Sequence, residues 1–240
     1  MRKAIILCSG GLDSVTTAYH VKNSLSYNSL MILFFNYNQK SIKRERELSR
    51  KTASKLKAKF MEIKLPELSN ISNSLINKKG KVAKLSLNDL KDTKSESSKW
   101  YVPQRNLTFI TYALAMADSL FIKNKEKSDV FLGFKCEGSD SYPDTTKEFL
   151  SAVNTLSKVS SVSQAKIIAP LIDKDKEDII LLGKKLGINF KDTFSCYTGK
   201  NTHCGQCLAC RLRQEGFYWA NIRDPTEYKK KMKDFRTSKD

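Results

Sequence analysis

Two short segments near opposite ends of the chain carry the residue types that chemistry requires. The first is "CSGGLDS" at positions 8–14, directly after the apolar run "AIIL". Its glycines let the backbone come close to a phosphate, its serines supply hydroxyl donors, and the free N–H groups at the start of a following helix favour an anion. Asp13 fits such a site once a divalent cation is added, because it can then hold Mg²⁺ or orient a nucleotide. The other interpretation is an ordinary turn with a Ser or Asp helix cap.

The second segment is "SCYTGKNTHCGQCLAC", in which four thiols follow the pattern C-x7-C-x2-C-x2-C. Four thiolates at this spacing can close a tetrahedral Zn²⁺ site, and a closed all-thiolate site is normally structural. We expect the zinc ligands to be Cys196, Cys204, Cys207 and Cys210. An iron–sulfur cluster is the alternative, because its ligands can follow the same compact run. His203 is a less favoured ligand that lies beside Cys204.

The length of 240 residues suits one sizeable domain, or one domain with a small appendage, and 40% hydrophobic residues suffice for a core. The longest apolar runs are too short to span a bilayer. The start "MRKAIIL" leads at once into Gly and Asp, which is typical of a first strand rather than a signal peptide. We therefore expect a cytoplasmic protein with no membrane partner, whose cysteines are thiols or metal ligands.

The formal net charge is +18, from 43 Lys and Arg against 25 Asp and Glu. Such an excess is found in proteins that bind nucleic acid or a polyanionic substrate. It is equally typical of a solvated surface, because these lysines are spread along the chain without interleaved aromatic residues. The charge alone leaves both interpretations open.

Buried apolar runs alternate with helical patterns along the chain. We expect strands at 3–8, 29–37, 59–65, 129–134 and 166–171, and helices at 13–25, 43–58, 107–123, 147–160 and 176–187. Short buried strands separated by helices predict an α/β fold with a doubly wound, mostly parallel sheet. Ligands of such sheets bind at the carboxyl ends of strands, which is where "SGGLDS" falls.

The chain is expected to divide into two parts. Residues 1–195 are predicted to form the α/β domain, and residues 196–240 a small zinc-binding helical tail. Within the first part, residues 69–100 are rich in Ser, Asn and Lys and have weak periodicity. This composition predicts a long mobile excursion or lid.

"SGGLDS" resembles the pyrophosphate loop S-G-G-x-D-S of the N-type ATP pyrophosphatases, which have the adenine nucleotide alpha hydrolase-like fold. With the cysteine-bearing tail, it makes the chain similar, nearly end to end, to the 7-cyano-7-deazaguanine synthase family of the queuosine and archaeosine precursor pathway. The other matching segments are "FFNYNQKSIKRERE" at 34–47, "YVPQRN" at 101–106, "GFKCEGSDSYPDTTKEF" at 133–149 and "APLIDKDKEDI" at 169–179.

The resemblance implies an ATP-dependent carbon–nitrogen ligase. With Mg²⁺, ATP and ammonia it would convert 7-carboxy-7-deazaguanine into 7-cyano-7-deazaguanine through adenylated intermediates, and each chain would hold one structural Zn²⁺. Adenylation gives an unreactive carboxylate a good leaving group, so the protein mainly positions ATP and neutralises phosphate charge. A homodimer is compatible with the resemblance, and direct nucleic-acid binding is not required.

The resemblance also assigns roles to individual residues. Those expected at the ATP site are Cys8, Ser9, Gly10, Gly11, Leu12, Asp13, Ser14, Val15, Thr16, Thr17 and Ala18. Those expected to be catalytic are Asp13, Arg105 and Lys176, and those expected to bind the substrate are Lys135, Glu137, Tyr142 and Asp144. The guanidinium of Arg105 can hold a phosphate or a carboxylate with two hydrogen bonds, although a surface or helix-capping arginine is the alternative. Lys176 can reach phosphate or simply lie on a helix surface.

The chain departs from the family pattern at the expected substrate loop. Lys135 stands where the family has Asn, Gly138 where it has Asp, and, after the second strand, Asn38 where it has Gly. A related adenylating enzyme acting on another carboxylate, including one on a protein or peptide, is therefore an alternative. A basic four-cysteine nucleic-acid-binding regulator is a second alternative, and the α/β pattern argues against it. A tRNA-thiolating enzyme would need an added RNA-binding domain or a further cysteine pair, and the sequence shows neither.

Overall fold

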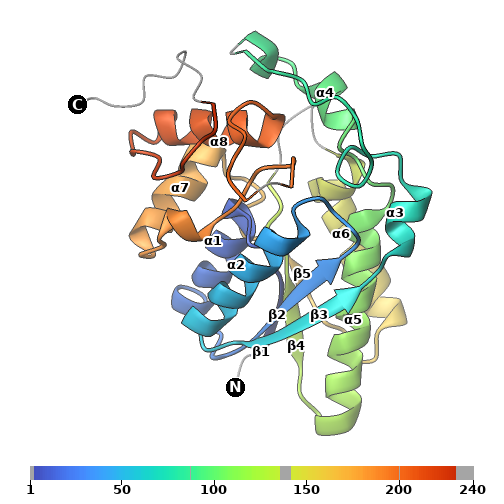
Figure 1. Cartoon of the computed structure of the whole chain (residues 1–240). Coiled ribbons are helices and arrows are strands. Elements are labelled where there is room, and N and C mark those ends of the chain that lie inside the picture. Colours follow the sequence, from blue (N-terminus) through green and yellow to red (C-terminus); the bar gives the residue numbers. More distant parts are fainter. Residues whose placement is uncertain (1–2, 87, 136–141, 200, 231–240) are drawn as a thin grey trace.

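A sheet of five parallel strands lies at the centre of the fold (Figure 1), in the order β3-β2-β1-β4-β5. The computed structural model describes residues 3–86, 88–135, 142–199 and 201–230. The strands are β1 (Lys3–Leu7), β2 (Ser29–Asn36), β3 (Lys59–Lys64), β4 (Ser128–Phe131) and β5 (Ile167–Ile168). All five expected strands are present. The last is much shorter than expected, because only Ile167 and Ile168 pair with β4.

Helices follow the strands as the periodicity predicts. They are α1 (Leu12–Asn23), α2 (Ile42–Lys55), α3 (Glu67–Ile71), α4 (Lys94–Ser98), α5 (Arg105–Asn124), α6 (Lys147–Ser160), α7 (Lys176–Lys185) and α8 (Leu208–Trp219). Short 3-10 turns lie at η1 (Asn88–Leu90), η3 (Pro143–Thr145) and η4 (Phe190–Asp192).

Helices cover both faces of the sheet, and the alternation of side chains along β1 shows why. Ala4 and Ile6 join a core with residues of α1, α2, α7 and α8. Ile5, between them, joins a second core with residues of α5 and α6. A strand buried on both faces has to be apolar at successive positions, as "AIIL" is. The predicted doubly wound fold is therefore confirmed.

The central position of β1 defines where a ligand can bind. From β1 the chain moves outward to β2 and β3, and then returns to the other side of β1 to form β4 and β5. The strand order thus reverses between β1 and β4, which pair in parallel with Ile6 opposite Phe131. In open α/β sheets this reversal leaves a crevice at the carboxyl ends of the two strands.

Residues 69–100 form a long connection with little regular structure. Its side chains at Ile76, Leu85 and Trp100 are buried. Backbone hydrogen bonds join it to the rest of the chain, from Lys40 N to Ile76 O at 2.9 Å and from Leu85 N to Gln206 O at 3.2 Å. The excursion therefore reaches from the end of β2 to the cysteine-rich segment. Its mobility stays a prediction.

The C-terminal helix α8 packs against α7 and contributes to the core on that face of the sheet. Phe217 of α8 meets Phe190 edge to face, with the ring centroids 5.1 Å apart. Four cysteines that could hold a metal ion lie before and at the start of α8, and the helix expected in this region is present. The division of the chain at residue 195 stays a prediction.

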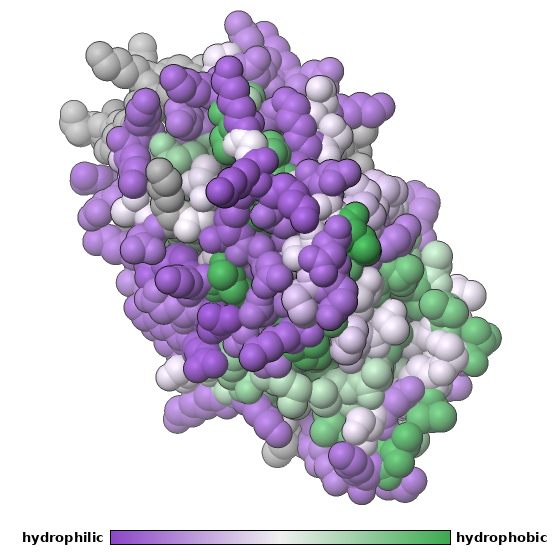
Figure 2. All heavy atoms as spheres, turned by 45° about the vertical axis from the view of Figure 1, so that its right-hand side comes forward, coloured by the Kyte–Doolittle hydropathy of each residue, from purple (hydrophilic) through white to green (hydrophobic). Residues whose placement is uncertain are grey.

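The surface is mostly hydrophilic on the face that Figure 2 shows, with apolar side chains gathered toward its lower right. The exposed apolar side chains of the protein include Ile122 on α5 and Leu156 and Val159 on α6. None of the helices in the described part of the chain is both long and apolar enough to cross a membrane.

Candidate functional site

A cavity of about 350 Å³ opens at the carboxyl ends of β1, β2 and β4. The ends of these strands, the start of α5, the start of α7 and residues of the C-terminal region all contribute to its wall. It brings together ten of the residues expected at the site, which are Cys8, Ser9, Gly11, Leu12, Asp13, Ser14, Arg105, Lys135, Tyr142 and Lys176. The cavity therefore lies where the fold predicts a ligand.

The segment 8–14 forms the turn between β1 and α1. The Ser9 N–H donates to Ser14 Oγ at 3.2 Å, and the Ser14 hydroxyl donates to the Gly11 carbonyl at 3.1 Å. Gly10 has φ +75°, and a Cβ there would lie 2.9 Å from the carbonyl oxygen of Glu45. Glycine is therefore required at position 10 both for its backbone conformation and for the close approach of α2.

Gly133, directly after β4, is a site residue that sequence reasoning did not single out. A Cβ at this position would lie 2.9 Å from both the backbone N and the Cα of Ser14. Close packing of the β4 end on the first turn of α1 therefore needs a residue without a side chain. Its signal in the sequence is a glycine placed directly after a buried strand, at the ligand-binding edge of the sheet.

Asp13 and Lys176 meet across the cavity, although 163 residues separate them. The Lys176 ammonium lies 2.8 Å from each oxygen of the Asp13 carboxylate. Both side chains are partly open to solvent, at 17% for Lys176 and 28% for Asp13. The pair places one anionic and one cationic group beside the glycine turn, where a phosphate and its metal would need them.

The remaining residues expected at the ATP site are placed differently. Four of them are buried in α1 and do not line the cavity: Val15, Thr16, Thr17 and Ala18. The Thr17 hydroxyl donates to the Asp13 carbonyl at 3.0 Å. This part of α1 supports the loop from behind, because a helix leaves the turn and carries its next residues into the core.

Arg105 is the first residue of α5 and follows Gln104, which has a positive φ of 53°. Its guanidinium lies near Tyr37, with Nη1 3.5 Å from the phenol oxygen. Its Nε donates to Asn106 Oδ1 at 3.2 Å. Burial raises the pKa of the Tyr37 phenol, so this group stays neutral. Arg105 therefore faces the cavity as a cation with an uncharged neighbour.

Asp144 is buried behind Asn106 and does not line the cavity. Its Oδ2 accepts from the Asn106 N–H at 3.2 Å, and its carbonyl accepts from Asn106 Nδ2 at 3.3 Å. Because Asn106 Oδ1 in turn accepts from Arg105 Nε, Asp144 is linked to Arg105 through one amide. This arrangement lets Asp144 support Arg105, and its expected contact with the substrate stays a prediction.

The other expected substrate residues divide into two groups. Tyr142 and Lys135 line the cavity. The Tyr142 hydroxyl donates to the Ser97 carbonyl at 2.9 Å, and its ring stacks on Tyr101. Glu137 lies in the segment 136–141, outside the described residues.

A hydrogen-bonded group of three polar residues also lines the cavity and was not singled out from the sequence: Gln39, Ser41 and Glu45. Gln39 Nε2 donates to Glu45 Oε2 at 2.8 Å, and the Ser41 hydroxyl contacts Glu45 Oε1. Burial raises the pKa of the Glu45 carboxyl, while the hydrogen bonds and Arg105 act in the opposite direction. Glu45 lies in the matching segment 34–47, but its helix has the pattern of a charged surface helix, so the sequence did not point to a place in the cavity.

The four cysteines of the tail lie together and are all buried. Their sulfurs all lie within 4.8 Å of one another, and those of Cys204 and Cys210 are 3.9 Å apart. Backbone N–H groups of Gln206 and Cys207 point at the Cys204 sulfur, at 3.5 and 3.3 Å. Hydrogen bonds from the neighbouring thiols hold the pKa of Cys204 well below its usual range. The four-cysteine group fits a metal ion, because its four sulfurs are close together and buried.

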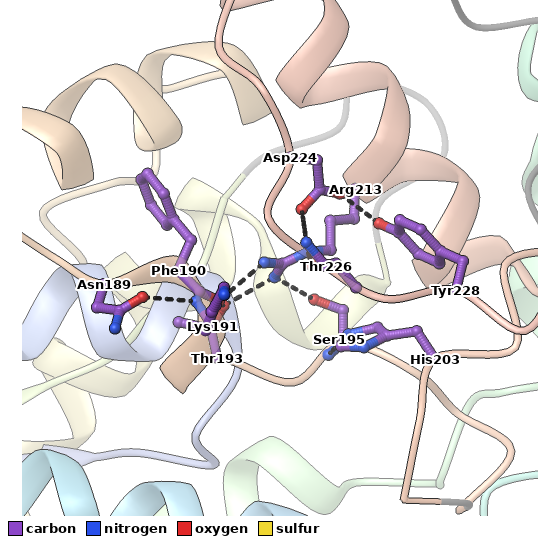
Figure 3. Close-up of polar contacts among 10 residues, drawn as sticks. All are labelled: Asn189, Phe190, Lys191, Thr193, Ser195, His203, Arg213, Asp224, Thr226 and Tyr228. Carbon is purple, nitrogen blue, oxygen red and sulfur yellow. Dashed lines mark hydrogen bonds and ion pairs between the residues drawn. The ribbon is translucent and has the colours of Figure 1, made fainter. Parts of the chain in front are cut away.

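His203 does not join this group as a ligand. Its Nε2 accepts a hydrogen bond from the Ser195 N–H at 3.1 Å (Figure 3), so the lone pair of that nitrogen is occupied. Burial and the Arg213 charge lower the pKa of His203 to about 3. The imidazole is therefore neutral and serves to hold the loop that carries Cys196.

Arg213 of α8 fixes the same loop from the other side (Figure 3). Its buried guanidinium donates to Thr193 Oγ1 at 2.8 Å and to the Phe190 carbonyl at 3.1 Å. The Asp224 carboxylate, 3.6 Å from its Nε, balances the charge. These contacts tie residues 190–195 to α8, so the first cysteine ligand is held in register with the three that follow.

The chain is similar to known proteins over nearly its whole length. Residues 3–221 match the family described as queuosine biosynthesis protein QueC. The chain is 37% identical over 232 residues to the 7-cyano-7-deazaguanine synthase of Methanosphaera stadtmanae, covering 95% of this chain and 99% of that one. It is 36% identical over 233 residues to the protein of the same name from Nitratiruptor sp., with 95% and 99% covered.

A solved structure that aligns with the chain is the U34-tRNA thiolase NcsA from Methanococcus maripaludis. The TM-score is 0.44 at 14% sequence identity, and the alignment covers 93% of this chain and 64% of the thiolase. A likeness of this degree carries no conclusion about the site.

Proposed function

The chain belongs to the family of queuosine biosynthesis protein QueC, and on that premise we propose that it is an ATP-dependent 7-cyano-7-deazaguanine synthase. The substrates are 7-carboxy-7-deazaguanine, ammonia and ATP with Mg²⁺. The observation that carries the proposal is the cavity itself, which gathers the glycine turn, the Asp13–Lys176 pair and Arg105 at the reversal point of the sheet.

The reaction needs two activations of one carbon. Transfer of AMP to the carboxylate gives a mixed anhydride, and attack by ammonia then gives the amide. A second transfer, to the amide oxygen, allows elimination to the nitrile. In both transfers the protein has to hold the triphosphate in line and stabilise the charge that develops on pyrophosphate.

The residues of the cavity divide this work by their chemistry. The N–H groups at the start of α1 suit phosphate oxygens. Asp13 suits the Mg²⁺ ion that accompanies ATP. Lys176 would then leave Asp13 and pair with a phosphate oxygen. Arg105 suits either a phosphate or the substrate carboxylate.

We propose a single structural Zn²⁺ for the four-cysteine group. Zinc–sulfur bonds of about 2.3 Å place tetrahedral ligands about 3.8 Å apart, and the sulfurs already lie within 4.8 Å of one another. An iron–sulfur cube binds its four ligands at four separate irons, so it needs them further apart. When bound, the ion joins Cys196 to α8 and so stabilises the wall of the cavity that Ser195 and Tyr197 form.

The proposal is tested by exchange of labelled pyrophosphate into ATP, which requires reversible adenylation of the acid. We expect exchange that depends on 7-carboxy-7-deazaguanine and on Mg²⁺. Lys135, on the cavity wall, replaces the family's Asn, so the test has to show whether this acid is the substrate. Clear binding of ATP with neither binding of this acid nor exchange would refute the proposed substrate.

A further inference from the structure

Glu45 is a carboxylate in the cavity that forms no ion pair in the described part of the chain, although Arg105 lies near enough to act on its charge. Of the described residues that line the cavity, Asp13 and Glu45 are the acids. Asp13 is paired with Lys176, whereas Glu45 forms no ion pair within the described part of the chain. A cavity that receives a triphosphate and an anionic acid gains nothing from a second negative charge, unless a cation also binds there.

The surroundings of Glu45 hold the carboxylate in one position. One hydrogen bond reaches each of its oxygens, from Gln39 and from Ser41. Gln39 is itself fixed, because its Nε2 also donates to the Phe35 carbonyl at 3.0 Å and its Oε1 accepts from the Tyr37 N–H at 3.0 Å. A carboxylate has about four acceptor sites, so both oxygens keep capacity for a further donor.

The same hydrogen bonds indicate which cation fits. Mg²⁺ needs several oxygen ligands in an octahedron, but Gln39 turns its NH₂ toward Glu45 and uses its oxygen on Tyr37. A small cation that donates hydrogen bonds is a better match for a carboxylate with spare acceptor sites. The reaction has one such cation, because free ammonia is almost entirely ammonium at neutral pH.

We propose that the Glu45 carboxylate binds this ammonium ion and takes one of its protons. The ion then attacks as NH₃: the C–N bond forms as the C–O bond to AMP breaks, and AMP leaves with the electron pair. The nitrogen loses a second proton to solvent, so the products are the amide, AMP and two protons. Glu45 returns its own proton to water before the next attack. This role rests on the proposed function.

The electrostatic surroundings suit a proton acceptor. The titratable and charged groups that face Glu45 are Tyr37, at the end of β2, and Arg105, at the start of α5. Tyr37 is neutral, and burial raises the pKa of the Glu45 carboxyl, which makes it a stronger base than an ordinary carboxylate. Glu45 lines the same cavity as the glycine turn, so the base stands in the cavity that is proposed to hold ATP and the acid.

The test separates adenylation from amide formation in the Glu45→Gln variant. We expect pyrophosphate exchange within about twofold of the wild type. Amide formation from ammonium at pH 7 should fall by about 10²-fold, which is the usual loss of rate when a general base is removed. The loss should shrink as the pH rises and free NH₃ becomes available. Hydroxylamine, which is mostly neutral at pH 7, should attack the adenylate without the Glu45 base, so the variant should form the hydroxamic acid at about the wild-type rate. Glu47→Gln, on the exposed side of the same helix, is the matched control and should behave as the wild type.

Three results would overturn the inference. They are an equal loss of exchange and amide formation, which would mark a metal or folding role, an unchanged rate with ammonium, and a loss that hydroxylamine does not restore. Failure of the proposed function looks different, because the wild type itself would then show no exchange with the deazaguanine acid.

Discussion

Both oxygens of the Asp13 carboxylate accept a hydrogen bond from the Lys176 ammonium, each at 2.8 Å. The pair joins the start of α1 to the start of α7, across the mouth of the cavity. Without ATP, each group neutralises the other. We expect bound ATP and Mg²⁺ to give each charge a new partner, Mg²⁺ for Asp13 and a phosphate oxygen for Lys176.

Removal of the Asp13 charge should therefore block chemistry without unfolding the protein. We expect Asp13→Asn to lower AMP formation by about 10²–10³-fold, the usual effect of losing one group that stabilises developing charge. Its thermal stability should change little, because the ion pair is partly exposed. Asp173→Asn is the control, since that carboxylate is largely exposed and pairs with Lys147 instead. AMP formation at the wild-type rate in Asp13→Asn would show that the carboxylate has no role in adenylation.

The glycine turn offers a comparison between two positions with the same backbone conformation. Gly10 and Gly187 have φ +75° and +73°. A Cβ at Gly10 would lie 2.9 Å from the backbone oxygen of Glu45 in α2, whereas a Cβ at Gly187 would have no atom within 4 Å. Alanine at Gly187 should cost about 1–2 kcal/mol of unfolding free energy. Alanine at Gly10 should cost about 1–3 kcal/mol more, through overpacking against α2. Equal losses in denaturant unfolding would mean that α2 does not press on the turn.

Asp144 should act through Arg105. We expect Arg105→Ala and Asp144→Ala each to lower the rate of pyrophosphate exchange, Arg105→Ala by more. The double variant should be no worse than Arg105→Ala alone, because the Asp144 carboxylate acts on Arg105 through its charge and through the Asn106 backbone N–H that it binds. Effects that multiply in the double variant would instead favour a separate contact between Asp144 and the substrate.

The four-cysteine group should hold one zinc ion per chain, which metal analysis of the purified protein measures. Cys204→Ser should release the metal and lower the thermal midpoint, since metal binding of this kind is coupled to folding. Adenylation should decline with it, because Ser195 and Tyr197 on the same loop line the cavity. Iron with acid-labile sulfide, or a fully stable protein without metal, would disprove a structural zinc site.

The sequence predicts the parts of this structure that depend on local pattern. The strand β1, the helix α5 and the four cysteines follow from apolar runs, helical period and ligand spacing, and all three are present as expected. The pairing of Asp13 with Lys176 does not follow in the same way, because it depends on where α7 begins relative to α1.

The residues that sequence reasoning missed share one property: their role comes from another element. The sequence pattern shows Glu45 as one of many charges on a surface helix. In the structure, Gln39, which follows β2, hydrogen-bonds to its carboxylate, and both residues line the cavity. Gly133 matters because α1 passes 2.9 Å from the place of its absent side chain.

The measurement that tests the central claim most directly is mass spectrometry of 7-carboxy-7-deazaguanine incubated with the protein, ATP, Mg²⁺ and ammonium. We predict conversion of the acid to 7-cyano-7-deazaguanine, with the amide as an intermediate and one ATP consumed to AMP and pyrophosphate for each of the two activations. Recovery of the acid unchanged from a protein that binds ATP and contains its metal would contradict the proposed function.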